Sequence, residues 1–370
     1  MTIGVLREPS FERRVVVTPE VVVQLRKLKT EVLIEQGAGE AAFIADHTYT
    51  EAGGNIARRS ELLDKSDILL TIQGLEAGEL SVLKPDQVVM AIFNPYQNKD
   101  LVKTLATTGI TAFSFEMVPR TTRAQAMDVL SSMATVAGYR AVLDAALHLP
   151  RFFPMFMSAA GTIKPAKVLI LGAGVAGLQA IATARKLGAI VEVFDVRNAV
   201  KEEVQSLGGK FIEVEGAKDD KAAGGYAVEQ TDEFKEKQKQ LIHKHAVSSN
   251  VVITTAQIPG RKAPVLLTKE TVQAMSPGSV IIDLAASTGG NCELTKNAET
   301  IMSNGVTIIG KSDYPSDMSS DASKMFANNV FNFLKLIIGK EGELQLNFSD
   351  DIVKGACIVH KGEIVNEKLK

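Results

Sequence analysis

The chain has 370 residues, of which 45% are hydrophobic and 23% charged, and its formal net charge at pH 7 is −2. This length exceeds what one hydrophobic core usually supports, so we expect two domains of ordinary size. The 41 basic and 43 acidic residues nearly cancel and no long basic block occurs, which argues against nucleic-acid binding.

Two cysteines, Cys292 and Cys357, argue against a disulfide framework and are typical of a reducing compartment. The N-terminus lacks the apolar core of a signal peptide. The most membrane-like window, residues 168–184, carries three glycines and is better explained as a buried strand and helix. We therefore predict a cytoplasmic protein with free thiols that spans no membrane by itself.

Short apolar runs alternate with amphipathic stretches along the first third of the chain. We expect strands at residues 3–6, 31–35, 68–72, 88–92 and 111–114, and helices at residues 19–29, 48–53, 60–65 and 98–109. This βαβ alternation is typical of a doubly wound parallel sheet. No glycine-rich turn follows the first strand, so we do not expect a nucleotide site in this domain.

The polar segment 116–132 overlaps the start of a long helix predicted at residues 125–149. It contains Arg120, Arg123, Gln125, Asp128 and Ser131. We place it at the junction of the two domains, where substrates usually bind. The last three side chains recur every three residues and could set an amide, a carboxylate and a hydroxyl against one bound ligand. The alternative is a helix start with solvated charges.

The second alternation begins with a dinucleotide-binding pattern. A buried apolar run at residues 168–171 leads into Gly172, Gly174 and Gly177, the G-x-G-x-x-G spacing, and then into a helix at residues 175–187. Gly172 permits the tight turn, Gly174 lets the backbone approach a pyrophosphate, and Gly177 allows close helix packing. The pyrophosphate would sit on the helix N-terminus.

An acid completes this pattern. Asp195 ends the second strand about 20 residues after the turn, where a carboxylate can accept hydrogen bonds from the adenosine ribose. A 2′-phosphate would be repelled there, which favours NAD over NADP. Arg197 lies two residues later and could accommodate such a phosphate, so it opposes that preference.

The rest of the chain completes two domains. Further strands are expected at residues 190–194, 210–214, 251–254, 279–283 and 306–309, and helices at residues 233–245 and 321–338. Residues 216–232 form a polar, glycine-bearing loop whose length suggests a mobile flap. We predict an α/β protein with two doubly wound parallel-sheet, Rossmann-like domains joined by long helices: residues 1–127 plus 318–370, and residues 128–317.

Several motifs resemble one enzyme family. The segments 120–132, 137–142, 172–184, 224–227 (Gly-Gly-Tyr-Ala) and 289–292 (Gly-Gly-Asn-Cys) are similar to the NAD(H)-binding domain of proton-translocating nicotinamide nucleotide transhydrogenase, in its short α-subunit form. Alanine dehydrogenase is the nearest relative of that family. The resemblance covers essentially the whole chain.

The resemblance implies roles for particular residues. Arg120, Gln125, Asp128 and Ser131 would hold the nicotinamide half of NAD(H), as catalytic-site residues. The cofactor-binding set would be Gly172, Gly174, Val175, Gly177, Asp195, Val196, Arg197, Gly225, Tyr226 and Gln257. The chain departs from the family pattern at Gln230, Gln257 and Asp317. We expect no metal: His243 and His245 fit a solvated helix end better than a metal site.

The resemblance also implies partners. The chain would be a homodimer, peripheral on the cytoplasmic face of the cell membrane, with NADP(H) on a separate subunit and a membrane subunit carrying protons. Hydride transfer between nicotinamides needs positioning and no general base.

Two alternatives stay open. Alanine dehydrogenases use a lysine near residues 68–73 and a histidine near residues 88–94, and neither stretch contains one here. Arg13 and Arg14 match a carboxylate-binding arginine of those enzymes, but we interpret both as structural. An amino-acid dehydrogenase with a relocated acid/base is therefore the first alternative. The second is a non-catalytic NAD-binding sensor.

Overall fold

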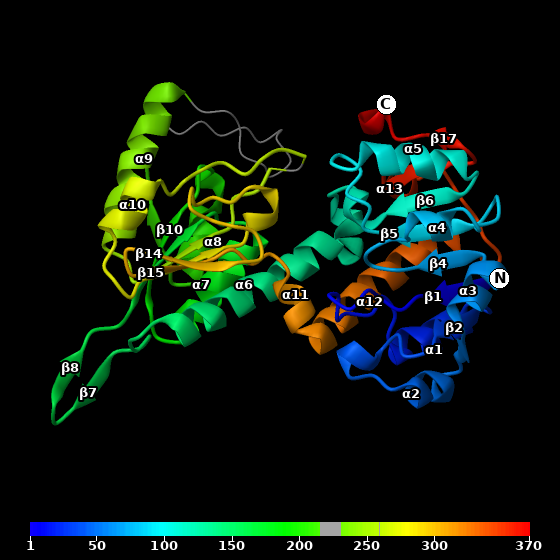
Figure 1. Cartoon of the computed structure of the whole chain (residues 1–370), viewed down its shortest axis with the longest axis horizontal. Helices are drawn as coiled ribbons and strands as arrows, with labels where there is room; N and C mark the ends of the chain where they lie inside the picture. Colours follow the sequence, from blue (N-terminus) through cyan, green and yellow to red (C-terminus); the bar gives the residue numbers. More distant parts are fainter. Residues whose placement is uncertain (215–230, 259) are drawn as a thin grey trace. The chain divides into compact units, whose positions relative to one another are not determined.

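The structure, a computed structural model, describes residues 1–214, 231–258 and 260–370. Gly225, Tyr226 and Gln230 of the predicted flap lie outside the described residues. The chain forms two compact units (Figure 1): Met1–Met133 with Pro315–Lys370, and Ala134–Tyr314.

One mixed sheet forms the centre of the first unit. Its strands are β1 (Thr2–Val5), β2 (Glu31–Glu35), β3 (Asn55–Ala57), β4 (Ile68–Leu70), β5 (Val88–Ala91), β6 (Thr111–Ser114), β16 (Cys357–His360) and β17 (Glu363–Ile364). Their order within the described residues is β17-β16-β6-β5-β4-β1-β2-β3. Strands β1 to β6 are parallel, whereas β16 and β17 add antiparallel. The predicted parallel sheet therefore gains an antiparallel edge from the chain's C-terminal part.

Helices cover both faces of this sheet. They are α1 (Pro19–Lys27), α2 (Asp46–Glu51), α3 (Arg59–Lys65), α4 (Ala77–Leu80), α5 (Lys99–Thr107), α12 (Ser319–Ile337) and α13 (Asp351–Ala356). On one face, Leu62 of α3 and Leu105 of α5 share a core with Val89 of β5. On the other, Phe333 of α12 packs edge-to-face on Phe113 of β6, with ring centroids 5.4 Å apart. The helix after Pro315 thus returns to the first unit.

The second unit has its own sheet. Its strands are β9 (Lys167–Leu171), β10 (Ile190–Phe194), β11 (Lys210–Ile212), β12 (Val251–Thr254), β13 (Val280–Asp283), β14 (Thr300–Ser303) and β15 (Val306–Ile309). Among the residues described, the order is β11-β10-β9-β12-β13-β15-β14, and only β14 is antiparallel. The central strands are mostly apolar because both faces of the sheet are buried, and their polar residues, such as Thr254 and Asp283, stand at strand ends.

Two helical layers sandwich the second sheet. Its helices are α6 (Val129–His148, from Ala134 onward), α7 (Val175–Lys186), α8 (Lys201–Ser206), α9 (Asp232–Val247) and α10 (Lys269–Ala274). Helices α6, α7 and α8 pack on the face that carries Ile170, and α9 and α10 pack on the face that carries Leu169. Successive strand residues point to opposite faces, which explains this division.

The strand order reverses at one point in each sheet. In both units the first three strands run outward in one direction and the next three in the other, so the reversal lies between β1 and β4 and between β9 and β12. Ligands of open α/β sheets bind outside the carboxyl ends of the strands at such a reversal.

Short elements escaped prediction. Residues 150–165, expected to be a plain link, contain a hairpin of β7 (Phe156–Ser158) and β8 (Gly161–Ile163) that extends from its own unit in Figure 1. Strand β3 and helices α4, α8, α10 and α13 were also missed, because they are too short to display a clear hydrophobic period. Strand β14 was missed although the turn Asn304-Gly305 joins it to β15.

Candidate nucleotide-binding site

The glycine turn connects β9 to α7 at the reversal point. Gly172 has φ +107°, and a Cβ there would come within 2.5 Å of the Thr255 hydroxyl, just past the end of β12. A methyl group at Gly177 would overlap the Gly172 carbonyl oxygen. Gly177 therefore allows the first turn of α7 to close against the glycine turn itself, in addition to its predicted approach to the sheet.

Gly174 faces open space. A Cβ added there would meet no described atom within 4 Å. Gly174 is also the N-cap of α7, and no side chain of the described residues caps that helix. The first N–H groups of a helix have no acceptor within it and, with the dipole, attract anions. The geometry fits a phosphate seated on α7, next to the exposed Val175.

Asp195, directly after β10, lies beside this turn. One carboxylate oxygen accepts from the Ala173 N–H and from Arg197 Nη2, both at 2.7 Å. The other accepts from the Arg197 N–H at 2.8 Å and from Arg197 Nε at 2.9 Å. These four bonds use the roughly four acceptor positions of a carboxylate. Asp195 is thus close to the predicted pyrophosphate position and is engaged by Arg197, while Val196 packs on the core.

Gln257 lies at the carboxyl end of the neighbouring strand. It follows β12 by three residues, and its Nε2 donates to the Leu284 carbonyl at 3.0 Å. The structure therefore brings Gly172, Asp195 and Gln257 to one edge of one sheet. Gly225 and Tyr226 stand outside the described part of the chain.

The remaining predicted residues belong to the first unit or its boundary. Gln125 lies in a 3-10 helix, η3 (Thr122–Met127), and α6 begins only at Val129. The expected line of three side chains on one helix is therefore wrong. Asp128 acts as an N-cap: its carboxylate accepts from the Ser131 N–H at 2.9 Å and from the Ser131 hydroxyl at 2.6 Å. Short acids favour this position over a helix interior, which explains the break.

Four further contacts hold this segment. Arg120 Nε lies 3.9 Å from the Asp128 carboxylate. Arg123 forms an ion pair with Asp350 at 2.6 Å. Asn329 and Asn332 of α12 both donate to the Ala126 carbonyl, at 2.8 and 3.2 Å. The asparagines were missed because they are about 200 residues away in sequence, and their only local signal was polarity on a buried helix face.

Comparison with known families shows to which family the chain belongs. The model of the alanine dehydrogenase/PNT N-terminal domain matches residues 4–137, and that of the alanine dehydrogenase/PNT C-terminal domain matches residues 141–367.

The chain belongs to the alanine dehydrogenase/PNT family.

Relatives within this family are close. The chain is 46% identical to the first part of the NAD(P) transhydrogenase subunit alpha of Rhodospirillum rubrum, over 98% of this chain and 97% of that one. The structure is similar to that of a transhydrogenase from Sinorhizobium meliloti, with a TM-score of 0.91 and 41% identity, over 99% of this chain and 100% of that one. L-alanine dehydrogenase shares the fold, with a TM-score of 0.83 and 24% identity over 100% and 98% of the chains.

In this family member, two arginines that could have bound a substrate carboxylate are already engaged. Arg14 is buried and pairs with Glu12 through Nε at 2.8 Å and Nη2 at 2.5 Å. Gln73, just after β4, donates to the same carboxylate at 2.7 Å. Arg13 lies over the Phe43 ring, 5.9 Å from its centroid. The structural interpretation of both arginines agrees with these contacts.

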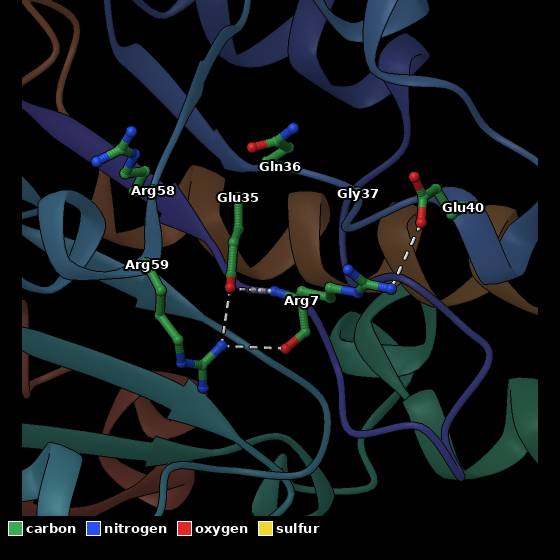
Figure 2. Close-up of a pocket in the computed structure, with 7 residues that line it drawn as sticks. All are labelled: Arg7, Glu35, Gln36, Gly37, Glu40, Arg58 and Arg59. Carbon is green, nitrogen blue, oxygen red and sulfur yellow. Dashed lines mark hydrogen bonds and ion pairs between the residues drawn. The ribbon is translucent and has the colours of Figure 1, made fainter.

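A polar hollow in the first unit does not coincide with the predicted site. It has a volume of about 310 Å³ and lies at the carboxyl ends of β1, β2 and β3 (Figure 2). Four of its charged side chains form two ion pairs: Arg59 lies 2.7 Å from Glu35, and Arg7 lies 3.4 Å from Glu40. None of the predicted site residues lines it.

One histidine differs from expectation. His245 is not at a solvated helix end, because its Nδ1 lies 2.6 Å from the buried Glu192 carboxylate of β10. Burial alone would raise the pKa of Glu192, but hydrogen bonds from Lys167 and His245 lower it. Within the described ranges, no cluster of three or more His, Cys, Asp or Glu side chains could hold a metal ion.

Both cysteines are free and buried, as predicted. Burial raises the pKa of Cys292 to about 11 and that of Cys357 to about 12, so both stay protonated at neutral pH. A protonated thiol is a poor nucleophile, so neither is suited to covalent chemistry. In the part of the chain that the structure describes, no helix is both long and apolar enough to cross a membrane.

Proposed function

We propose that this chain is the NAD(H)-binding subunit of a proton-translocating transhydrogenase. The glycine turn with its open Gly174, at the reversal point of a sheet, carries the proposal. The near full-length similarity to the first part of a transhydrogenase subunit alpha supports it. The partner subunit would hold NADP(H), and a membrane subunit would move the protons.

The second unit would bind the adenosine and pyrophosphate part of the cofactor. The N–H groups at the start of α7 would hold the pyrophosphate, and Gly174 leaves room for it. Asp195 would accept hydrogen bonds from the adenosine ribose once Arg197 releases an acceptor position. Val175 and Val196 would also surround this half.

The nicotinamide ring, when bound, supplies or accepts a hydride. Arg120, Gln125, Asp128 and Ser131 would orient it. Because Ser131 already donates its hydroxyl to Asp128, at 2.6 Å, this pair is ordered in advance. Pre-ordered polar groups accelerate a reaction by positioning, which is what hydride transfer requires.

The first unit argues against amino-acid oxidation. That reaction needs a group that exchanges protons with the substrate. Gln73 follows β4, near the position where alanine dehydrogenases use a lysine. Unlike a lysine, the carboxamide of Gln73 does not exchange protons at neutral pH. Its amide is also bonded to Glu12, at 2.7 Å.

We propose a homodimer that uses the β7–β8 hairpin. Large apolar side chains exposed on and near it are Phe152, Met155, Phe156, Met157 and Ile163. The Phe152 and Phe156 rings stack with centroids 4.8 Å apart. Contiguous apolar side chains in water indicate an interaction surface, and a second copy would cover them. The dimer would lie on the cytoplasmic face of the membrane through its partner subunits.

Hydride transfer from NADH to an NADP⁺ analogue with a shifted absorbance tests the proposal. The full chain is assayed alone and with an NADP(H)-binding transhydrogenase subunit. We expect rapid transfer only in the mixture. Tight NADH binding without transfer in the mixture would refute the transhydrogenase role, and an assay with pyruvate, ammonia and NADH would then follow.

A further inference from the structure

A fully buried carboxylate organises the carboxyl edge of the second sheet. Asp283 ends β13, and one oxygen accepts from the Thr254 hydroxyl and the Ala285 N–H, at 2.9 and 3.0 Å. The other oxygen accepts from the N–H groups of Asn291 and Cys292, at 2.8 and 3.0 Å. Gly290, with φ +79°, lets this backbone turn towards the carboxylate. The position of Asn291 is therefore fixed.

Asn291, itself fully buried, hydrogen-bonds to the backbone that follows the neighbouring strand β12. Its Oδ1 accepts from the Ala256 N–H at 3.0 Å, and its Nδ2 donates to the Ala256 carbonyl at 2.9 Å. Nδ2 also donates to the Pro264 carbonyl at 2.8 Å. One side chain thus satisfies both backbone groups of Ala256, as a neighbouring strand would.

Residues 255–257, which include Ala256, lie on the β12 side of the reversal point. The Thr255 hydroxyl donates to the Gly172 carbonyl at 3.0 Å, and Gln257 donates to the Leu284 carbonyl at 3.0 Å. Residues 255–257 are therefore held against the glycine turn by Thr255 and against the neighbouring loop by Asn291. In doubly wound folds the acid after the second strand marks the adenosine half of a dinucleotide, so the β12 side faces the other half.

We propose that Asn291 is a positioning residue that sets residues 255–257 for the nicotinamide half of the cofactor. It acts through Ala256 and does not touch the ligand. This inference rests on the proposed NAD(H) binding. It predicts that loss of the Asn291 side chain weakens binding of the whole dinucleotide and leaves binding of its adenosine half unchanged.

The test compares Asn291→Ala with Asn250→Ala in the full chain. Asn250 lies just before the amino end of β12, and its Oδ1 accepts from the Lys167 N–H at 2.9 Å. It is the matched control, because it also holds backbone but at the opposite end of the same strand. Dissociation constants for NADH and for AMP are measured by fluorescence and calorimetry, well below the melting temperature of each variant.

For Asn291→Ala we expect NADH to bind about tenfold more weakly, because both hydrogen bonds to Ala256 and the one to Pro264 are lost, with AMP binding unchanged. Asn250→Ala should bind both ligands as the parent does. Equal weakening of NADH and AMP, or NADH affinity equal to that of Asn250→Ala, would overturn the proposal. If Asn291→Ala does not fold, Asn291→Ser takes its place with the same expectations. Failure of the parent chain to bind NADH would instead refute the proposed function.

Discussion

The carboxylate of Asp195 accepts a hydrogen bond from the Ala173 N–H at 2.7 Å, so the acid after β10 fixes the turn after β9. The residue expected to recognise a ribose therefore also shapes the phosphate-binding turn. Arg197 engages both oxygens of the same carboxylate. We therefore expect Asp195 and Arg197 to set the nucleotide preference of this site together.

Arg197→Ala should sharpen the preference for NADH over NADPH. The change frees acceptor positions on Asp195 for ribose hydroxyls and removes the cation that could pair with a 2′-phosphate. We expect the ratio of the NADPH to the NADH dissociation constant to rise about tenfold, since a charged hydrogen bond contributes about 1.5–3 kcal/mol. Fluorescence titration measures both constants. An unchanged ratio would show that Arg197 does not contribute to the preference.

Alanine at two glycines of the turn should separate folding from binding. Gly177→Ala places a methyl group on the Gly172 carbonyl, so it should lower the melting temperature. Gly174→Ala meets open space at an ordinary φ of −77° and should leave the melting temperature nearly unchanged. Its methyl group would instead occupy space reserved for the pyrophosphate, so NADH should bind at least about tenfold more weakly. Calorimetry provides both readouts, and a reversed pattern would contradict the assignment of these glycines.

The nucleotide-binding pattern of the second domain could be predicted from the sequence because the residues that form it lie close together along the chain. The strand before Gly172, the glycine spacing and Asp195 lie within about 30 residues, and each has a backbone reason to be there. The helix–strand alternation likewise predicted the parallel sheets. The antiparallel edge of the first sheet was not predictable, because pairing of β16 with β6 depends on chain returning from more than 200 residues away. The antiparallel strand β14 of the second sheet did have a local signal, because the turn Asn304-Gly305 joins it to β15 in a hairpin.

The polar segment of the first unit shows where prediction from sequence periodicity fails. A period of three residues suggested one helix through Gln125 and Ser131, but Asp128 caps α6 and ends that pattern. The clamp of Asn329 on Ala126 depends on tertiary packing and has no sequence signature. Residues that touch a ligand could thus be proposed from sequence, whereas those that hold them in place could not.

Asp128→Asn should slow hydride transfer much more than it weakens NADH binding. Asparagine caps helices as well as aspartate does, so α6 keeps its start, while the charge and one of the two acceptor oxygens are lost. Stopped-flow transfer with the partner subunit measures the rate, and NADH titration measures affinity. Asp128→Ala, which removes the cap as well, provides the comparison and should also cost about 1 kcal/mol of stability. Parallel losses of rate and affinity in Asp128→Asn would refute a positioning role.

Asn329→Ala should reduce the transfer rate without contact to a ligand. The variant removes the 2.8 Å bond to the Ala126 carbonyl and leaves only that from Asn332, at 3.2 Å. We expect about 1 kcal/mol of lost stability and a several-fold slower transfer. The neighbouring Asn328, exposed on the same helix, is the matched control, and Asn328→Ala should change neither quantity. Equal transfer rates in the two variants would show that the clamp does not matter for chemistry.

Glu8 should make the first unit less stable as pH rises towards neutrality. Burial raises the pKa of Glu8 from 4.5 to about 7, despite hydrogen bonds from Ile72, Gln73 and Thr71. The folded state therefore binds this proton more tightly than the unfolded state does. The resulting stabilisation is complete below pH 4.5 and is lost as pH rises through 7, a change of about 3 kcal/mol.

The stability difference between the parent and Glu8→Gln isolates this effect, because other titrating groups cancel. Urea unfolding of the full chain across this pH window should show that the stability of the parent falls relative to that of Glu8→Gln as pH rises. Glu12→Gln is the control of opposite sign. Burial would raise the pKa of Glu12, but the hydrogen bonds and charge of Arg14 lower it, so its stabilisation persists across the window. A pH-independent difference for Glu8→Gln would show that Glu8 titrates near its ordinary pKa and that its three hydrogen bonds offset the effect of burial.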